Sequence, residues 1–362
     1  MIDTFVRIAK RDNNSKRKYL VLNKNQGKHV PVAPSISMRM FKKLADLIKE
    51  YFINEKLLLI GFAETATAIG ATVSTELDTY YIQTTREDMG DVDYLFFSEE
   101  HSHATEQKVV KNSIDKIINE VDRIVFIEDE ITTGNTILNA INAFENKYKV
   151  SFKYGVASIL NGMSYEHEQK YKEKCIPVLY LKKIDNSKFD SLVSDVKSDG
   201  YNFKPMRFES LQCPVINIKS IVDARLLVKG NEYKDACERF WEELQHQMKL
   251  KGNVLVLGSE EFMYPPLYIA SKIEKMGFDV KFHATTRSPI VVSENKDYPL
   301  HSRFELKSLY NKDRNTFLYD LEKYDTVVVI TDSKYDEGIG YKELLEALNS
   351  KGNNNIYFVR WC

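Results

Sequence analysis

The chain of 362 residues contains few cysteines and few of the residues that interrupt regular structure. Its 4 cysteines stand far apart with no C-x-x-C pair, so we expect neither a disulfide framework nor a cysteine-bound zinc ion. The 15 glycines and 9 prolines, with 43% hydrophobic and 28% charged residues, exclude collagen-like, low-complexity and disordered chains. The composition is typical of a globular protein in a reducing compartment.

The sequence also lacks a charge excess and long hydrophobic runs. Because 51 Lys and Arg stand against 52 Asp and Glu, no long-range field attracts nucleic acid or an anionic membrane, and we expect neither as a partner. The longest apolar runs, 57–60 and 327–330, are far shorter than the roughly 20 residues of a membrane helix. Residues 1–19 have no apolar export signal, so we expect a cytoplasmic protein.

The sequence does contain short runs rich in Val, Ile and Tyr that alternate with stretches of helical period, a pattern typical of parallel sheets covered by helices. The first series predicts strands at 57–60, 79–84, 124–127, 154–159 and 178–181, and helices at 38–51, 65–77, 113–121 and 136–147. The second predicts a helix at 233–249 and strands at 254–257, 280–283, 327–330 and 356–359. We therefore predict the α/β class and two domains, residues 1–205 and 206–362, the second of them Rossmann-like.

The two series align with each other. Residues 57–65 correspond to 254–262, 80–87 to 280–288, and 123–134 to 326–338. Either one domain was duplicated, or both share only the common strand–turn–helix rhythm of α/β domains. Similar paths of the two sheets would favour duplication.

The most informative segment is RIVFIEDEITTGNTILNAI, residues 123–141. An apolar strand runs into Glu128 and Asp129, then into a turn of small hydroxyl residues, after which a helix begins. Backbone N–H groups at such a turn and helix N-terminus bind phosphate, and two acids one sugar-width away suit two ribose hydroxyls. The predicted 5-phosphate-binding residues are Thr132, Thr133, Gly134, Asn135 and Thr136. The alternative is an ordinary strand–helix turn with surface acids.

This segment resembles the phosphoribosyl-pyrophosphate (PRPP) motif of the type I phosphoribosyltransferases, which is an apolar strand, two acids and a T-T-G-x-T-like loop. The resemblance implies a parallel sheet flanked by helices, phosphoribosyl transfer from PRPP, and Mg²⁺ that arrives with the substrate rather than in a dedicated protein cage. It makes Glu128 and Asp129 the catalytic acids, on the 2- and 3-hydroxyls. The sequence has neither G-x-G-x-x-G nor G-x-x-x-x-G-K-[ST], so the dinucleotide and Walker signatures are absent.

The resemblance also implies a site for pyrophosphate. The loop after the strand at 57–60 would bind it, mainly through backbone amides, with Ala63, Glu64, Thr65, Ala66 and Thr67. Glu64 is unusual beside a polyanion, and it either reaches Mg²⁺ or the acceptor or caps the helix. Arg86, which lies just after the strand at 79–84, either clamps phosphate oxygens or forms an ion pair at the surface.

Between Arg86 and residue 113 the sequence has no clear period, and the resembled family has a mobile loop there that closes over the reacting centre. The candidate lid or substrate residues of this loop are His101, His103 and Lys108, and the alternative is that each is a solvated loop residue.

Over most of its length the chain resembles a narrower family, the PRTase-2 type phosphoribosyltransferases fused to a TRSP domain, of bacterial tellurite-resistance (ter) stress operons. The segments that carry this resemblance are residues 19–34, FAETATAIG, SEEHSHATEQ and ATTRSPI, while residues 163–215 match least. The first of them adds Lys28 and His29 as lid or substrate residues. The resemblance implies a step in making a nucleotide-like metabolite, and a homodimer is usual in the family.

In the second domain the segment ITDSKYDEG keeps Asp332 but lacks the T-T-G loop, and Asp336 and Glu337 would repel a phosphate. We therefore infer that this cup no longer binds PRPP. The candidate residues of a second-domain site, in loops that follow strands, are Glu261, Tyr264, Thr286, Arg287 and Ser288. Arg287 would suit a second substrate with a phosphate or carboxylate. The alternative is structural, with a helix cap at Ser259 and prolines that fix a turn.

Three functions fit the sequence. We favour a phosphoribosyltransferase that uses PRPP and a nitrogenous acceptor, which the sequence does not identify. The second is a regulator that binds PRPP or a nucleotide and signals through its second domain. The third is an enzyme similar to PRPP synthetase, which also has two such halves, but no matching ATP-binding stretch is found.

Overall fold

The computed structural model describes residues 5–12, 14, 17–98, 106–149, 152–205, 213–220, 222–334 and 338–362. The chain divides into two compact units, each built from separate stretches of sequence. Unit 1 contains residues 1–37, 187–221 and 237–362, and unit 2 contains residues 38–186 and 222–236. The boundary that the sequence predicts, between residues 205 and 206, falls within a segment of unit 1.

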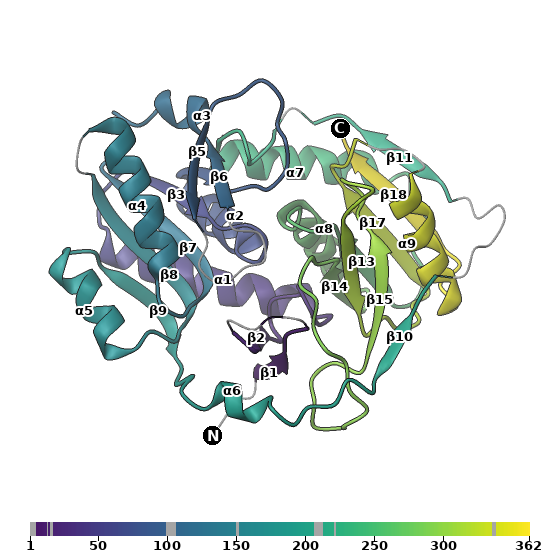
Figure 1. The fold of residues 1–362 in the computed structure, drawn as a ribbon. Coiled ribbons are helices and arrows are strands. Elements are labelled where there is room, and N and C mark those ends of the chain that lie inside the picture. The colour runs from purple at the N-terminus through teal and green to yellow at the C-terminus, as the bar shows by residue number, and fades with distance from the viewer. Residues whose placement is uncertain are drawn as a thin grey trace. The chain divides into compact units, whose positions relative to one another are not determined.

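Unit 2 is built around a six-stranded sheet with the order β12-β4-β3-β7-β8-β9, parallel except for β12 (Figure 1). Its strands are β3 (Leu57–Gly61), β4 (Tyr80–Gln83), β7 (Arg123–Ile131), β8 (Lys153–Asn161), β9 (Val178–Lys183) and β12 (Val228–Lys229). Its helices are α1 (Pro34–Tyr51), which begins in unit 1, α2 (Thr67–Leu77), α3 (Lys111–Asp115), α4 (Asn135–Tyr148) and α5 (Tyr165–Glu173). A separate antiparallel hairpin pairs β5 (Tyr94–Ser98) with β6 (Glu106–Val110).

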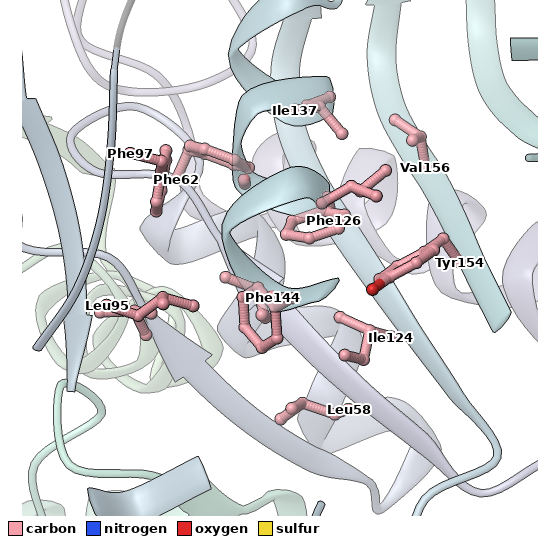
Figure 2. Close-up of a cluster of buried hydrophobic side chains, with 14 of the residues drawn as sticks. Leu58, Phe62, Leu95, Phe97, Ile124, Phe126, Ile137, Phe144, Tyr154 and Val156 are labelled. Carbon is pink, nitrogen blue, oxygen red and sulfur yellow. The ribbon is translucent and has the colours of Figure 1, made fainter. Parts of the chain in front are cut away.

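One face of this sheet carries a core that α4 and the β5–β6 hairpin cover (Figure 2). Phe126 of β7 lies at its centre, with ring centroids 5.9 Å from Phe62 and 6.2 Å from Phe144 of α4. Leu58 and Ile60 point into this core, whereas Leu57 and Leu59 alternate to the other face. Because β3 and β7 are buried on both faces, their apolar runs are continuous, and the sequence therefore identifies them.

Unit 1 has a five-stranded parallel sheet with the order β11-β18-β17-β13-β14. Its strands are β11 (Val215–Ile218), β13 (Val254–Gly258), β14 (Val280–Ala284), β17 (Thr326–Thr331) and β18 (Ile356–Trp361). Its helices are α6 (Phe189–Leu192), α8 (Tyr264–Lys275), α9 (Ile339–Ser350) and most of α7 (Gly230–Leu244), whose first turns belong to unit 2. Smaller sheets join β1 (Val6–Lys10) to β2 (Tyr19–Asn23), and β10 (Tyr201–Phe203) to β15 (Ser302–Lys307) and β16 (Asn315–Tyr319).

The two sheets follow the same path. The order β4-β3-β7-β8 in unit 2 matches β14-β13-β17-β18 in unit 1. The register also agrees, because Gly61 pairs with Gln83 and Ile127, and the corresponding Gly258 pairs with Ala284 and Ile330. A shared rhythm of strands and helices does not by itself fix register, so the agreement supports duplication of one domain.

Beyond the sheets, each unit adds a hairpin in the same place. Thr85, just after β4, forms an antiparallel bridge with Lys108 of the β5–β6 hairpin. Thr286, just after β14, forms the same kind of bridge with Phe317 of the β15–β16 hairpin. The α/β class predicted from the sequence is thus confirmed, whereas both hairpins lie in stretches where the sequence predicted no strand.

Within the described part of the chain, no helix combines the length and the apolar character that crossing a membrane requires.

Candidate active site

The acidic pair and the hydroxyl-rich turn lie where the sequence places them, between β7 and α4. Glu128 and Asp129 occupy the end of β7 and keep part of their surface exposed. The turn residues Thr132, Thr133, Asn135 and Thr136 are also partly exposed, and Gly134 is buried. The Thr133 hydroxyl accepts a hydrogen bond of 3.3 Å from the Asn135 N–H at the start of α4. Carboxylates, hydroxyls and a helix N-terminus are therefore grouped at one edge of the sheet.

Gly134 is required at this turn for two reasons. Its φ of +75° is a left-handed conformation that residues with a Cβ rarely adopt, and an added Cβ would lie 2.5 Å from the Tyr171 hydroxyl oxygen. That hydroxyl donates a 2.6 Å hydrogen bond to the Gly134 carbonyl. Burial, and to a lesser degree the charge of Glu128, raises the pKa of Tyr171, so its phenol is neutral and acts as a donor. Tyr171 of α5 thus contacts the turn and is hydrogen-bonded to it, a role that the sequence analysis did not assign.

Asp129 is joined to the loop that follows β3. The Thr65 hydroxyl donates a 2.7 Å hydrogen bond to Asp129 Oδ1. Burial raises the pKa of Asp129 from 3.8 to about 6, with Thr65 acting in the opposite direction and the nearby Glu130 charge adding to the rise. One contact therefore brings together two segments that lie 64 positions apart in the sequence.

The loop between β3 and α2 uses several of its own polar groups internally. The Ala63 N–H donates to Thr84 Oγ1 at 2.8 Å, and the Ala66 N–H donates to the Phe62 carbonyl at 3.0 Å. A ligand that used either amide would have to replace an existing hydrogen bond. Glu64 is buried, the peptide bond between Ala63 and Glu64 is cis, and the Thr67 hydroxyl donates to the Glu64 carbonyl. Helix α2 has Ala66 at its N-cap, and this alanine makes no side-chain cap hydrogen bond.

Arg86 follows β4 and is partly exposed, on the same edge of the sheet as the loop. The segment after it, expected to be irregular, contains the β5–β6 hairpin. Lys108 lies on β6 with its ammonium 4.2 Å from the centre of the Tyr94 ring, a cation–π contact. His101 and His103 lie outside the described residues.

Lys28 and His29, predicted as lid or substrate residues, are buried within unit 1. The Lys28 ammonium donates to the carbonyls of Glu260 at 2.5 Å and Thr285 at 2.9 Å. This ammonium is therefore used in holding together the loops that follow β13 and β14.

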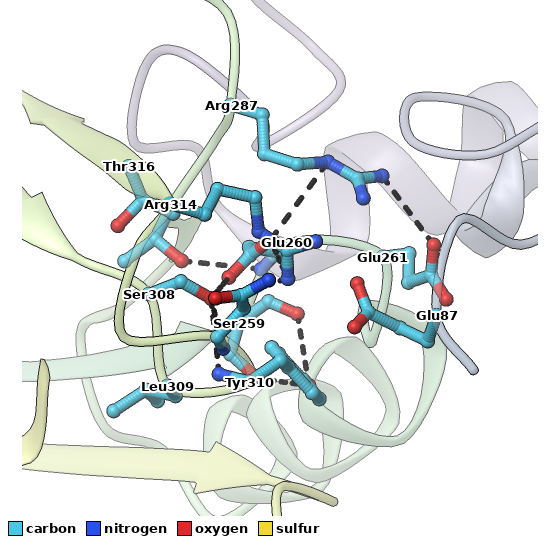
Figure 3. Close-up of polar contacts among 12 residues, drawn as sticks. Glu87, Ser259, Glu260, Glu261, Arg287, Ser308, Leu309, Tyr310, Arg314 and Thr316 are labelled. Atoms are coloured by element: carbon cyan, nitrogen blue, oxygen red, sulfur yellow. Dashed lines mark hydrogen bonds and ion pairs between the residues drawn. The ribbon is translucent and has the colours of Figure 1, made fainter. Parts of the chain in front are cut away.

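Two candidate residues of the second domain, Glu261 and Arg287, lie in the loops after β13 and β14 and point toward each other (Figure 3). Arg287 approaches two buried carboxylates, Glu261 at 3.4 Å and Glu260 at 3.8 Å. Arg314, which the sequence analysis missed, lies 2.9 Å from Glu260, and Ser308 donates a hydrogen bond to the same carboxylate. The arrangement is a buried cluster of ion pairs, whose contribution to stability is small unless the pairing is complete.

The neighbouring candidates in unit 1 are mainly buried. Tyr264 is the first residue of α8, Thr286 is fully buried, and Ser288 is partly exposed. The structural alternative expected the prolines after Tyr264 to fix a turn, and they lie in the first turn of α8. The N-cap of α8 is Met263, and the Ser259 hydroxyl donates to Thr331.

No group of three or more His, Cys, Asp or Glu side chains suited to a metal ion occurs among the residues described. Mg²⁺ in sites that bind phosphorylated substrates takes one or two carboxylates, with substrate phosphates and water completing its shell. The partly exposed carboxylates at the end of β7 offer oxygen ligands of this kind.

Comparison with known proteins agrees with this arrangement. Residues 5–178 match the family model PRTase_2, described as phosphoribosyl transferase, and residues 228–348 match the TRSP domain located C-terminal to PRTase_2. No curated protein matches the chain significantly.

Among solved structures, adenine phosphoribosyltransferases are similar to this chain. The Trypanosoma brucei enzyme, in complex with AMP, pyrophosphate and ribose-5-phosphate, is 15% identical over 53% of this chain and 78% of its own, with a TM-score of 0.37. The Rhodothermus marinus enzyme is 15% identical over 51% of this chain and 96% of its own, with a TM-score of 0.37. The Giardia lamblia enzyme, complexed with 9-deazaadenine, is 13% identical over 49% of this chain and 93% of its own, with a TM-score of 0.37.

The resemblance inferred from the motifs is confirmed by the two matched regions and their order along the chain. This chain therefore belongs to the phosphoribosyltransferases in which a PRTase_2 domain is followed by a TRSP domain.

Proposed function

We propose that unit 2 transfers the phosphoribosyl group of PRPP to a nitrogenous small molecule and releases pyrophosphate, with Mg²⁺ bound together with the substrate. The observation that carries the proposal is the Thr65–Asp129 hydrogen bond of 2.7 Å. It joins the loop proposed for pyrophosphate to the acids proposed for the ribose. The hydroxyl-rich turn for the 5-phosphate follows on the same strand.

Each part has a distinct role in this proposal. Glu128 and Asp129 accept hydrogen bonds from the ribose 2- and 3-hydroxyls. Their negative charge also favours the cationic sugar that develops while the bond from C1 to pyrophosphate breaks. The acceptor nitrogen then bonds to C1, and pyrophosphate leaves with the electron pair of the broken bond. The 5-phosphate lies on the turn formed by residues 132–136.

The leaving pyrophosphate is bound by the loop after β3 together with Arg86. The loop residues of this proposal are Ala63, Glu64, Thr65, Ala66 and Thr67, and the amides of Ala63 and Ala66 would exchange an existing hydrogen bond for one to a phosphate oxygen. Glu64 and the acidic pair are the carboxylates that would hold Mg²⁺, which would supply positive charge to the pyrophosphate when bound. The lid or substrate candidates His101, His103 and Lys108 belong to the same proposal, whereas Lys28 has the structural role described above and His29 is buried.

For the rest of the molecule, the proposal follows the family resemblance. The product is a nucleotide-like metabolite made in the cytoplasm within a stress response, as in ter operons, by an enzyme that we expect to be a homodimer. The cluster formed by Glu261 and Arg287, with Tyr264, Thr286 and Ser288 beside it, is a candidate site for a second ligand.

The test is pyrophosphate release from PRPP and Mg²⁺ across a panel of purines, pyrimidines and simple amines. We expect turnover with at least one acceptor, and its loss when Glu128→Gln and Asp129→Asn are combined. The control is Glu173→Gln, which removes an exposed carboxylate at the end of α5 and should leave turnover unchanged. PRPP binding without any pyrophosphate release would instead identify a regulator. Formation of PRPP from ATP and ribose 5-phosphate would identify a synthetase.

A further inference from the structure

The loop after β3 is held by a closed ring of three hydrogen bonds. The Ala63 N–H donates to Thr84 Oγ1 at 2.8 Å, and the Thr84 hydroxyl donates to Gln107 Oε1 at 2.8 Å. The Gln107 Nε2 group donates to the Ala63 carbonyl at 2.9 Å, which closes the ring. The three residues come from the loop, from the residue after β4 and from β6.

The chemistry of the ring fixes the orientation of the Gln107 amide. A carbonyl only accepts, so Nε2 must face Ala63. The Thr84 hydroxyl accepts from the Ala63 N–H, so its own proton is left for Oε1. All three residues are buried, with relative exposures of 6% for Ala63, 0% for Thr84 and 2% for Gln107. Each bond is therefore shielded from water, and losing one leaves a buried polar group unsatisfied.

The ring acts on the part of the loop proposed for pyrophosphate. The Ala63 carbonyl and the Glu64 N–H belong to one planar peptide group, so the hydrogen bond from Gln107 restricts the rotation of that whole group. Hydrogen-bond donors for an anion work best when they are aligned before the ligand arrives. The donor that sets this alignment comes from the β5–β6 hairpin, which ties the hairpin to the loop.

Unit 1 contains the same arrangement with a different third partner. The Glu260 N–H donates to Thr285 Oγ1 at 3.1 Å, as Ala63 does to Thr84. The Glu260 carbonyl accepts from the Lys28 ammonium instead of from a hairpin glutamine. A donor to this carbonyl is therefore common to both copies, but only in unit 2 does it come from the hairpin.

We propose that Gln107 is a positioning residue that aligns the loop after β3 for the pyrophosphate end of the substrate and couples this loop to the β5–β6 hairpin. The inference rests on the proposed function of unit 2. The inference can be tested on the two halves of the substrate site separately. The ring includes a residue of the pyrophosphate loop and no residue of the 5-phosphate turn at 132–136.

The test is calorimetric titration of the full chain with Mg²⁺ and three probes: PRPP, inorganic pyrophosphate and ribose 5-phosphate. For Gln107→Leu we expect affinity for PRPP and pyrophosphate to fall about 5- to 30-fold, the effect of losing one or two buried hydrogen bonds. Affinity for ribose 5-phosphate should stay within about twofold, the size of a negligible contribution. Equal losses for all three probes would show a general structural role and overturn the inference, as would unchanged binding of all three.

Gln107→Glu is the conservative variant, and it keeps the test decisive where Gln107→Leu fails to fold. A carboxylate still accepts from Thr84 but repels the Ala63 carbonyl, whereas its protonated form can donate to that carbonyl. The ratio of wild-type to variant affinity for pyrophosphate should therefore shrink as the pH is lowered from 8 towards 5. A ratio that does not change with pH would contradict the assigned bond.

Thr285→Val is the matched control, since it removes the equivalent loop contact in unit 1. It should leave the affinities for all three probes unchanged, and a loss as large as that of Gln107→Leu would overturn the inference. If the wild-type chain binds neither PRPP nor pyrophosphate, the proposed function itself is wrong. If the wild type binds them and Gln107→Leu binds them equally well, only the role of Gln107 is wrong.

Discussion

At the scale of single residues, Asp129 combines a cost in stability with a use in binding. Burial raises its pKa from 3.8 to about 6, so near pH 7 the folded protein holds a carboxylate whose ionised form its surroundings disfavour. Above pH 6 the charged form of Asp129 therefore lowers the stability of the fold. This loss of stability disappears as the pH falls towards 4. Such tension between stability and charge is common where a side chain serves binding.

Asp129→Asn should therefore stabilise the protein at pH 7 by at most about 3 kcal/mol while abolishing PRPP binding. The asparagine keeps an oxygen that accepts from Thr65 and removes the disfavoured charge. Thermal melting from pH 4 to pH 8 checks this: the gain in melting temperature should be full at pH 7 and vanish near pH 4. A variant that is less stable at pH 7 would show that the carboxylate is a net stabilising group.

Wild-type affinity for PRPP should fall as the pH drops through about 6, because the ionised form of Asp129 is the better acceptor for ribose hydroxyls. Calorimetric titration at pH 5, 6, 7 and 8 measures this, with ribose 5-phosphate as a second probe that contains the same diol. Inorganic pyrophosphate, which has no diol, serves as the comparison for pH effects that do not involve Asp129. Affinity for PRPP that rises towards pH 5 would exclude this role.

Gly134→Ala should weaken ribose 5-phosphate binding and destabilise unit 2. Gly90 offers a matched control, since its φ is +80° and nothing lies within 4 Å of an added Cβ. Gly90→Ala should cost about 1–2 kcal/mol from backbone strain alone. Gly134→Ala should cost about 1–3 kcal/mol more, because the Tyr171 ring must also move. Equal shifts in denaturant midpoint for the two variants would show that Tyr171 gives way without cost.

At the scale of elements, the sequence predicts the strands that have continuous apolar runs and misses those of the β5–β6 and β15–β16 hairpins. The strands β3, β7, β13 and β17 have continuous apolar runs because both faces are covered. In β15, by contrast, polar and apolar residues alternate, and such short half-buried strands give a weaker signal. The hydrogen-bond ring of Ala63, Thr84 and Gln107 could not be predicted from the sequence, because its members come from three segments that share no local pattern.

The short strand β12 shows how an element distant in sequence completes a unit. Val228 and Lys229 pair antiparallel with β4, and the Gln83 N–H donates to the Ala224 carbonyl. Gly230 follows directly, and a Cβ there would lie 2.1 Å from the Ser74 carbonyl oxygen. Residues 222–236 therefore cover the β4 edge of unit 2, which would otherwise present unpaired backbone groups.

Gly230→Ala should thus destabilise unit 2 by about 1–3 kcal/mol, because a backbone carbonyl has little freedom to move away. Gly338→Ala is the control, since no atom lies within 4 Å of its added Cβ and its φ is −64°. Hydrogen exchange of the amides of β4 is the measurement, and protection should fall in Gly230→Ala only. Unchanged protection would show that β12 contributes nothing to this edge.

At the scale of the whole molecule, two copies of one fold have kept the sheet and lost the symmetry of the site. Strand order and register agree between the units, and each has Thr-Thr-Arg after the corresponding strand, at Arg86 and Arg287. In unit 1, however, the arginine faces two carboxylates of its own chain, Glu260 and Glu261. The missing T-T-G loop predicts from sequence that unit 1 does not bind PRPP, whereas nothing in the sequence indicated the ion pairs in the loops after β13 and β14.

The chain should accordingly bind one PRPP and not two. In unit 1 a pyrophosphate would have to displace Glu260 and Glu261 from Arg287, and would meet their negative charge at the same place. Calorimetry with Mg²⁺ should give a stoichiometry of one PRPP per chain. Arg287→Ala should leave that number unchanged, whereas Glu128→Gln with Asp129→Asn should remove it. Two PRPP per chain, with one lost in Arg287→Ala, would show that the second copy still binds the substrate of the first.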